Sequence, residues 1–247
     1  MRQLLIINPN TTASISGLLQ LHAQQAAGPE VQVRTVTARF GATYIACEAS
    51  YAVAGHATLD AWAAALAEDG PAPDAVLIGC FGDPGLMALR ACSRAPVTGL
   101  AEGAFAEAAS HGRFAIVTGG HRWKPMLERL AHTLGHGQAL AGIHTVEATG
   151  AQLAQDPVAA RTLLAHACGQ AVRAFDVQAV ILGGAGLAGM AAAVQSDIDL
   201  PVIDSVLAGT RQALASAGAW HHQATGRIDV RWQHVSAELA ALGLQSD

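Results

Sequence analysis

Apolar residues along this chain gather in short uninterrupted runs that are separated by longer alanine-rich stretches. Most of the runs lack the polar alternation of a half-exposed strand, and this is typical of strands buried on both faces of a parallel sheet. We therefore predict a series of strands, most of them fully buried. They are Gln3–Ile7, Val31–Val36, Ala75–Gly79, Pro96–Gly99, Phe114–Thr118, Gly142–Val146, Ala179–Leu182 and Pro201–Ile203.

Helical stretches lie between these runs, so the chain has the alternating β–α order of an α/β fold with doubly wound sheets. The tail, residues 227–242, is expected to hold a final strand and helix. The predicted helices are Thr12–Ala26, Ala49–Glu68, Gly85–Cys92, Glu102–Ala109, Trp123–Leu134, Pro157–Phe175, Gly189–Gln195 and Val206–Ser216.

An internal repeat relates two parts of the chain. The segment Ala75–Cys80 reads Ala-Val-Leu-Ile-Gly-Cys, and it recurs 104 residues later at Ala179–Gly184 as Ala-Val-Ile-Leu-Gly-Gly. Two related halves of an α/β protein usually face each other across a cleft. The repeat therefore predicts two pseudo-symmetric domains with mainly parallel sheets and an active site in the inter-domain cleft. It places a thiol, Cys80, on one wall and no side chain, Gly184, on the other.

Composition narrows the classes of protein. Of the 247 residues, 51% are apolar and 13% are charged, which supports a large core and argues against disorder. The net charge is −5 and Lys124 is the single lysine, so we expect no nucleic-acid partner. The N-terminal apolar run stops at Asn8–Pro9 and no run reaches the roughly 18 residues of a membrane span. We expect a cytoplasmic protein with free thiols, no membrane partner and a small-molecule substrate.

Loops that follow the strands are the expected ligand-binding positions, because ligands bind beyond the carboxyl ends of parallel strands. Four such loops are rich in glycine or in amide and hydroxyl side chains. The repeat pairs the first with the third and the second with the fourth, so all four are predicted to converge on one cleft. They are Asn8–Thr12, Cys80–Gly85, Thr118–His121 and Gly183–Gly186.

The candidate catalytic residue is Cys80, at the end of a buried strand. Asp83 and Pro84 follow it as a helix N-cap and first turn, so we expect a helix to begin there. Backbone N–H groups and a helix N-terminus lower the pKa of a thiol, whereas the Asp83 carboxylate raises it, and the sequence leaves the balance open. The remaining cysteines are expected in helices beside alanines, with structural roles. They are Cys47, Cys92 and Cys168.

Substrate oxygens are expected to bind to backbone amides and to amide or hydroxyl side chains of the four loops. The histidines have no metal-binding spacing, so no metal is expected; His121 borders the third loop and is a candidate second acid/base. Neither a dinucleotide fingerprint nor a phosphate-binding loop is present. The predicted substrate-binding residues are Asn8, Pro9, Asn10, Thr11, Phe81, Gly82, Thr118, Gly119, Gly120, Gly184, Ala185 and Gly186.

Four segments together resemble the aspartate/glutamate racemase superfamily, in its hydantoin and allantoin racemase branch: Ile6–Thr12, Gly79–Leu86, Gly99–Gly103 and Pro201–Asp204. The Cys-Phe-Gly-Asp-Pro-Gly block in the second segment is the most specific. The resemblance implies no cofactor and a homo-oligomer, a dimer or higher. It also implies domains that exchange their ends, with residues 1–98 plus about 216–247 in the first and residues 99–215 in the second.

Members of this family typically carry one cysteine on each face of the substrate α-carbon. Cys80 matches the first, and Gly184 stands where the second is usual. We therefore expect a cofactor-independent racemase or epimerase, with Cys80 as acid/base, that acts on a hydantoin, allantoin or amino-acid-like substrate. A hydantoin ring proton is acidic because its anion is delocalised as an enolate, so a single thiolate suffices to remove it. The alternatives are a one-cysteine decarboxylase or cis–trans isomerase of the same superfamily, or a non-catalytic ligand-binding relative.

Overall fold

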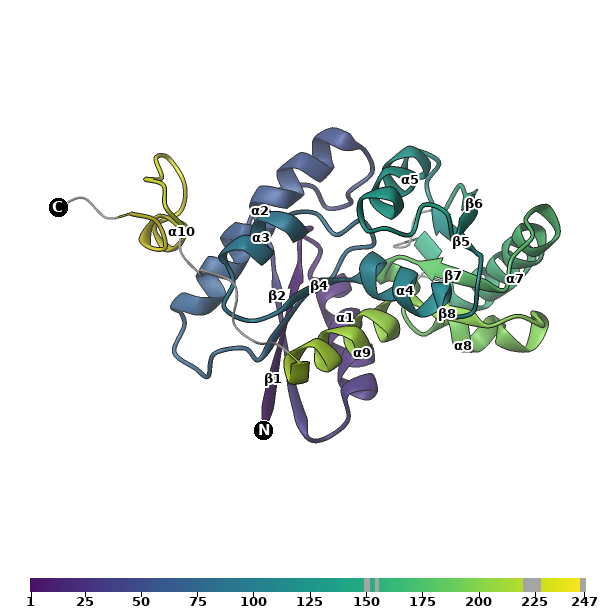
Figure 1. The fold of residues 1–247 in the computed structure, drawn as a ribbon, viewed down its shortest axis with the longest axis horizontal. Helices are drawn as coiled ribbons and strands as arrows, with labels where there is room; N and C mark the ends of the chain where they lie inside the picture. Colours follow the sequence, from purple (N-terminus) through teal and green to yellow (C-terminus); the bar gives the residue numbers. More distant parts are fainter. Residues whose placement is uncertain (149–151, 154–155, 220–227, 245–247) are drawn as a thin grey trace.

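Two four-stranded parallel sheets stand side by side, each covered by helices (Figure 1). The structure is a computed structural model that describes residues 1–148, 152–153, 156–219 and 228–244. The strands of the first sheet are β1 (Arg2–Asn8), β2 (Val31–Thr37), β3 (Ala75–Ile78) and β4 (Val97–Gly99). Those of the second are β5 (Phe114–Gly119), β6 (Leu140–Val146), β7 (Ala179–Gly183) and β8 (Val202–Asp204).

The two sheets have the same topology. Their strand orders are β2-β1-β3-β4 and β6-β5-β7-β8, so each strand of one sheet has a counterpart four strands later. The repeated segments become β3 and β7, and each of these strands pairs in parallel with the first strand of its half, β1 or β5. The predicted two-domain α/β architecture, with its eight strands, is confirmed.

Helices occupy every position at which the sequence predicted one. In the tail, residues 228–244 contain one short helix and no strand, so the predicted final strand is absent from that described segment. No helix of the described ranges combines the length and apolar character needed to cross a membrane. The helices are α1 (Ala13–Ala27), α2 (Glu48–Ala67), α3 (Leu86–Cys92), α4 (Leu100–Ala109), α5 (Trp123–Thr133), α7 (Pro157–Ala174), α8 (Met190–Val194), α9 (Ser205–Ala219) and α10 (Ala237–Ala241), with the 3-10 turns η1 (Ala185–Leu187) and η2 (Gln195–Asp197).

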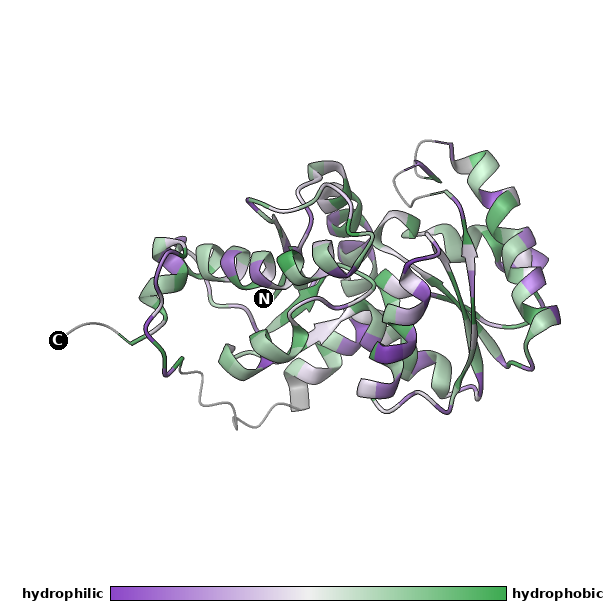
Figure 2. Cartoon of the chain, turned by 90° about the horizontal axis from the view of Figure 1, so that it is seen from above, coloured by the Kyte–Doolittle hydropathy of each residue, from purple (hydrophilic) through white to green (hydrophobic). Residues whose placement is uncertain are grey.

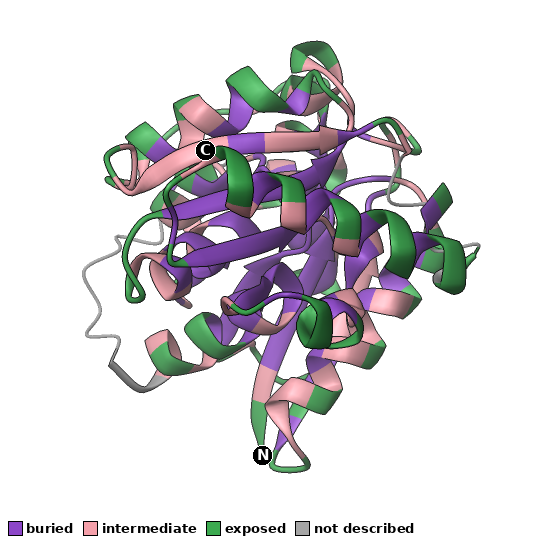
Figure 3. Cartoon of the chain, turned by 90° about the vertical axis from the view of Figure 1, so that its right-hand side faces the viewer, coloured by how far each residue is buried: buried purple, intermediate pink, exposed green. Residues whose placement is uncertain are grey.

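The central strands are mainly apolar because both faces of each sheet are covered, whereas the edge strands β2 and β6 include polar and partly exposed residues. In β1, Leu4 and Ile6 pack into a core that extends between the halves, whereas Leu5 and Ile7 face a second core beneath α2 and α3. Figure 2 shows the hydrophobic strands enclosed by helices with mixed surfaces, and Figure 3 shows that burial follows the same division. Burial on both faces removes the polar alternation that a half-exposed strand would show.

Two helices cross between the halves. Helix α4 follows β4 of the first sheet but packs against β7 of the second, and α9 follows β8 of the second sheet but packs against α1, β3 and β4 of the first. The short α10 then lies against α2 (Figure 1). Because α9 contacts both sheets, the division into residues 1–98 plus 216–247 and 99–215 stays a prediction.

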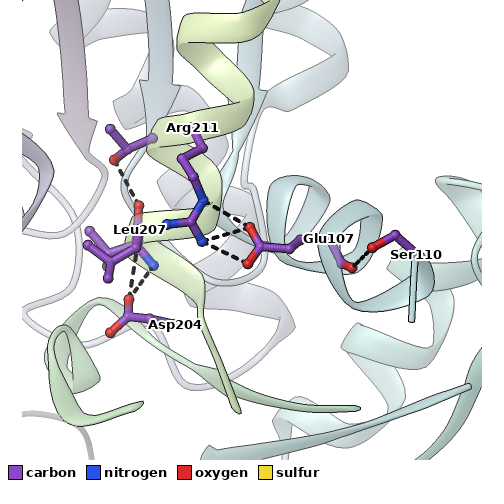
Figure 4. Close-up of polar contacts among 7 residues, drawn as sticks. Glu107, Ser110, Asp204, Leu207 and Arg211 are labelled. Atoms are coloured by element: carbon purple, nitrogen blue, oxygen red, sulfur yellow. Dashed lines mark hydrogen bonds and ion pairs between the residues drawn. The ribbon is translucent and has the colours of Figure 1, made fainter. Parts of the chain in front are cut away.

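The crossing helices α4 and α9 pack with their backbones in direct contact. A Cβ atom added to Gly103 of α4 would lie 2.6 Å from the Cα of Gly209 in α9, closer than side chains tolerate. Nearer the surface, the Arg211 guanidinium donates hydrogen bonds to both carboxylate oxygens of Glu107, as Figure 4 shows. The two glycines therefore set how closely the halves approach.

We predict that Gly103→Ala lowers the free energy of unfolding by about 1–3 kcal/mol, because the added methyl group forces α4 and α9 apart. Gly17→Ala is the matched control: Gly17 is also helical, in α1, but a Cβ there meets nothing within 4 Å. That control should gain about 0.5–1 kcal/mol from helix propensity. Urea unfolding of both variants measures the difference, and equal effects would contradict the close contact.

Candidate active site

A pocket opens where the carboxyl ends of the two sheets meet. The two walls touch at its base, because a Cβ on Gly183 of β7 would lie 2.2 Å from the Phe81 ring that follows β3. The loops after β1, β2, β3, β5 and β7 all reach the pocket, so both halves are needed to form it. Its lining consists of Asn10, Ile15, Thr43, Tyr44, Ile45, Gly79, Cys80, Phe81, Thr118, Gly119, Trp123, Gly183, Gly184, Ala185, Gly186 and Leu187.

Cys80 lies in this lining and is 9% exposed. Burial raises the pKa of its thiol well above the ordinary value, and the negative charge of Asp83 raises it further. The sequence left open whether the pKa of Cys80 is raised or lowered. In the structure it is raised, which favours the protonated thiol over the thiolate. The resting group is a protonated thiol, and its ionised form becomes available as the pH rises.

Asp83 does not cap the helix that follows it. Helix α3 begins at Leu86, with Gly85 as its N-cap in the left-handed region at φ 84°. The buried Asp83 carboxylate instead accepts hydrogen bonds from the backbone N–H groups of Ala101 and Glu102 at 2.9 and 2.8 Å, which caps helix α4. Burial raises the pKa of Asp83 to about 7, and these two hydrogen bonds act in the opposite direction. The prediction that Asp83 caps the helix directly after it, α3, is wrong. Its carboxylate reaches instead the N-terminus of α4, the helix that follows β4.

The second half provides the same cap from a different position. Asp204, at the end of β8, accepts hydrogen bonds from the backbone N–H groups of Val206 and Leu207, which begin α9 (Figure 4 draws the bond from Leu207). In the first half Gly99 ends the equivalent strand, and a Cβ there would lie 1.9 Å from the Asp83 carboxylate. The Asp83 carboxylate thus fills the space of the side chain that Gly99 lacks.

Gly184 lies at the position that the repeat pairs with Cys80, just beyond β7. Its φ of 143° is a conformation that L-residues rarely adopt, although a Cβ would have room and would meet Leu187 at 3.7 Å. Its N–H donates to the Ser205 hydroxyl at 3.2 Å. The backbone is therefore built for glycine here, and a cysteine would cost about 1–3 kcal/mol of backbone strain.

The loop after β1 contributes one residue, Asn10, to the pocket. The Asn10 Oδ1 accepts hydrogen bonds from the Thr12 N–H at 2.9 Å and from Asn8 Nδ2 at 3.1 Å. This arrangement fixes the amide and leaves its Nδ2 as a donor without a protein partner in the described part of the chain. The Asn8 side chain is fully buried, and its Nδ2 also donates a hydrogen bond to the Ser16 hydroxyl, so its polar groups stabilise the loop. Pro9 and Thr11 do not line the pocket.

Several of the predicted oxygen-binding groups already have partners inside the protein. The Thr118 hydroxyl donates to the Gly183 carbonyl at 2.8 Å, the Gly82 N–H to the Cys80 carbonyl at 2.9 Å, and the Gly120 N–H to the Val146 carbonyl at 2.8 Å. Of the predicted substrate-binding residues outside the first loop, those that line the pocket are Phe81, Thr118, Gly119, Gly184, Ala185 and Gly186. Gly82 and Gly120 lie outside the lining.

His121 is exposed and borders a separate surface groove together with Cys47 and Arg122. Cys47 is not inside a helix, as the sequence suggested, but is the N-cap of α2. A hydrogen bond with the Ser50 side chain lowers the pKa of Cys47, with smaller contributions from backbone N–H groups and from Arg122. The half-exposed thiol of Cys47 is therefore the more easily ionised one, while Cys80 lines the pocket between the two sheets.

Two parts of the lining were not among the residues predicted from the sequence. The loop after β2 supplies Thr43, Tyr44 and Ile45, and the start of α5 supplies Trp123. The rule that selects loops at the carboxyl ends of strands applies equally to the loop after β2. That loop lacks the glycine-rich composition that drew attention to the others. The Tyr44 hydroxyl donates to the Gly119 carbonyl at 3.2 Å, which joins this loop of the first half to the second half.

Charged side chains are absent from the described lining of the pocket. Over the described ranges, no three His, Cys, Asp or Glu side chains are grouped so that they could hold a metal ion. The chemistry of the pocket therefore depends on one thiol, one phenol, one amide side chain, two threonine hydroxyls, one indole N–H and backbone N–H groups.

We predict that iodoacetamide at pH 7.5 alkylates Cys47 before Cys80, because alkylation requires a thiolate. The Cys80 rate should rise only at alkaline pH, where its raised pKa allows ionisation. Peptide mass spectrometry after timed quenching distinguishes the two sites. Faster alkylation of Cys80 at neutral pH would contradict the assigned directions of both pKa shifts.

We predict that Asp83→Asn moves the alkylation profile of Cys80 to lower pH, because the variant removes the negative charge that raises the thiol pKa. Asp204→Asn is the matched control, since it weakens the equivalent cap of α9 without removing that charge. Each variant should lose about 1 kcal/mol of stability through its cap. A profile that moves equally in both variants would show that the cap, not the charge, governs the thiol.

Comparisons with known proteins agree with this architecture. Residues 4–213 match the family described as Asp/Glu/Hydantoin racemase. The chain is 31% identical to a hydantoin racemase of Pseudomonas sp. (strain NS671) over 84% of this chain and 83% of that protein. It is 30% identical to a hydantoin racemase of Paenarthrobacter aurescens over 85% and 89% of the two chains.

Among solved structures, allantoin racemase from Klebsiella pneumoniae superposes with a TM-score of 0.87 at 26% identity, covering 98% of this chain and 99% of that one. The family match covers most of the chain, including both sheets and the Cys80 loop. The predicted family and the predicted enzyme class, a racemase-type isomerase, are thereby confirmed. This chain belongs to the Asp/Glu/Hydantoin racemase family.

Proposed function

We propose that this protein racemises a neutral, hydantoin-like ring at the carbon between its carbonyl group and its ring nitrogen, with Cys80 as the acid/base on one face. The observation that carries the proposal is a pocket that presents a thiol among apolar and uncharged polar groups. The similarity to hydantoin racemases gives independent support. The reaction as proposed uses no cofactor.

The uncharged lining favours a neutral substrate over an amino acid or a dicarboxylate. Moving a carboxylate from water into such a pocket without a cationic partner carries a large desolvation cost. The same reasoning disfavours decarboxylation of a malonate, whose two carboxylates would both need compensation. Of the alternatives that the sequence left open, racemisation of a ring amide fits this electrostatic environment best.

One part of the pocket is apolar. Ile15, Ile45 and Leu187 contribute aliphatic surface, and Trp123 contributes its indole ring. Such a surface suits a hydrocarbon substituent on the reacting carbon, because burial of apolar area stabilises binding by about 25 cal/mol per Å². We therefore propose alkyl- or aryl-substituted hydantoins as the preferred substrates over the more polar allantoin.

The reaction begins with removal of the ring proton by the Cys80 thiolate. The electron pair of the broken C–H bond moves into the adjacent carbonyl group and forms an enolate. Donors near that oxygen lower the barrier because they bind the enolate more strongly than the neutral ring. Asn10 Nδ2 is one such donor, and the first N–H groups of turn η1, at Ala185 and Gly186, are others.

Removal of the proton depends on pH because the acidic form of Cys80 is the resting form. Its raised pKa means that the thiolate fraction increases as pH rises, so turnover should increase from neutral to alkaline pH. A thiolate of raised pKa is also a stronger base once it forms. Burial thus reduces the amount of active thiolate while it strengthens that thiolate as a base. The homo-oligomer and the cytoplasmic location stay predictions.

We predict that Cys80→Ser lowers the racemisation rate of a 5-benzyl- or 5-isopropylhydantoin at least about 100-fold, because a serine hydroxyl is a far weaker acid than a thiol. Polarimetry in D₂O, with proton NMR of the recovered substrate, measures inversion and deuterium incorporation together. Cys92→Ser is the matched control, since Cys92 ends α3 outside the pocket and should keep the parental rate.

The same assay on single enantiomers of aspartate and glutamate tests the substrate class. The hydantoins should turn over at least about 100-fold faster, because the pocket lining has no cationic side chain to pair with a buried substrate carboxylate. Faster turnover of the dicarboxylates would overturn the assignment to neutral rings. Unchanged racemisation in Cys80→Ser would overturn the role of this thiol.

A further inference from the structure

Racemisation through Cys80 requires a proton donor on the opposite face of the substrate. The wall opposite Cys80 is formed by the ends of β5 and β7, and Gly184 offers no side chain there. The Thr118 hydroxyl on that wall already donates to Gly183, and an alcohol is a weak acid. His121, the candidate suggested by the sequence, borders the outer groove and not this pocket.

Tyr44 brings a phenol to that wall from the other half of the molecule. Its loop is fastened to the first half by two hydrogen bonds, from the Thr11 N–H to the Ala42 carbonyl at 3.2 Å and from the Thr12 hydroxyl to the Thr43 carbonyl at 2.8 Å. From there the Tyr44 hydroxyl reaches across and donates to the Gly119 carbonyl at the end of β5.

The hydroxyl therefore lies on the wall that includes the position without a cysteine. The paired residues of β5 and β7 end at Thr118 and Gly183. Gly119 and Gly184 are the residues that follow this pair, and both line the pocket together with Tyr44. The Gly119 carbonyl accepts the hydrogen bond from Tyr44.

The surroundings of Tyr44 raise the pKa of its hydroxyl, so the resting group carries a proton that it can donate. Burial raises the pKa most, a hydrogen bond with the Trp123 side chain acts in the opposite direction, and the charge of Cys80 raises the pKa further. The Cys80 thiol and the Tyr44 hydroxyl are close enough for their charges to interact. Among the described residues that line the pocket, Cys80 and Tyr44 are the two with an ionisable side chain.

We propose that Tyr44 is the acid/base on the substrate face opposite Cys80, in place of the missing second cysteine. This inference rests on the proposed function. The Cys80 thiolate forms an S–H bond with the ring proton as the C–H bond breaks and the enolate forms. The Tyr44 O–H bond then breaks, its proton bonds to the same carbon from the other side, and the enolate electron pair forms the new C–H bond.

One negative charge moves in this sequence from the Cys80 sulfur to the Tyr44 oxygen, and no electrons are gained or lost. In the reverse direction the Tyr44 phenolate removes the proton and the Cys80 thiol donates. Between turnovers, proton exchange with solvent restores either starting state. Each group therefore acts on one enantiomer as a base and on the other as an acid.

The test uses both enantiomers of 5-(chloromethyl)hydantoin, whose enolate expels chloride as the carbon–carbon double bond forms. Chloride release reports proton removal on one face without any need for a proton donor on the other. The full-length protein should release chloride from both enantiomers. Tyr44→Phe, which removes the hydroxyl and keeps the ring, should process one enantiomer within about threefold of the parental initial rate and the other about 100- to 10,000-fold more slowly.

Cys80→Ser should show the opposite enantiomer preference, and racemisation of 5-isopropylhydantoin should fall about 100-fold or more in both variants. Tyr51→Phe is the matched control: Tyr51 is the other tyrosine, and its hydroxyl donates to the Gly82 carbonyl outside the pocket lining. Tyr51→Phe should keep the parental ratio of rates for the two enantiomers.

Equal effects of Tyr44→Phe on the two enantiomers would overturn the proposal. If both rates are retained, another base such as water removes the proton on that face, and if both fall together, Tyr44 only positions the loop. A parental protein that neither releases chloride nor racemises any hydantoin would instead overturn the proposed function. Thermal denaturation of each variant confirms that the compared proteins are folded.

Discussion

The close contact between α4 and α9 is the constraint on which the active site depends. Each of these helices follows a strand of one sheet and packs on the other, so neither half has a complete cover of its own. At the crossing, Gly103 brings its backbone against Gly209, and no side chain of ordinary size fits between them. The separation of the two sheets follows from this contact, and with it the distance across the pocket.

The same crossing explains why two buried carboxylates lie near the site. A helix that leaves its own sheet begins at the inter-domain junction, where its first N–H groups have no water to bind. Asp83 satisfies them for α4 and Asp204 satisfies them for α9. In the first half this places a carboxylate behind Cys80, which raises the pKa of the thiol. A structural need of the fold thus lowers the acidity of the Cys80 thiol.

Loss of symmetry between the halves accompanies the proposed chemistry. The repeat would place equivalent groups on both walls, but Gly184 has a backbone conformation that disfavours any residue with a side chain. The wall is completed by Tyr44, which arrives from the loop after β2 and is held by Gly119. In the proposed reaction, an asymmetric pair of a thiol and a phenol takes the place of a symmetric pair of thiols, and the pocket lining stays uncharged.

The sequence alone determined the local features of the protein. Continuous apolar runs identified most of the strands because both sheet faces are buried, and the repeat identified the two halves and the position of Cys80 at a strand end. It also identified much of the pocket lining, since the strand-end rule depends only on the parallel topology.

The tertiary structure decided which polar groups remain free to bind a ligand in the pocket. Asn8, Gly82 and Gly120 have suitable chemistry, yet hydrogen bonds within the protein occupy their polar groups. Tyr44 was invisible in the sequence because its position depends on a hydrogen bond to a residue 75 positions away. The pKa of Cys80 was undecided for the same reason: burial is a property of the packed halves, and it outweighs the local helix geometry that sequence can suggest.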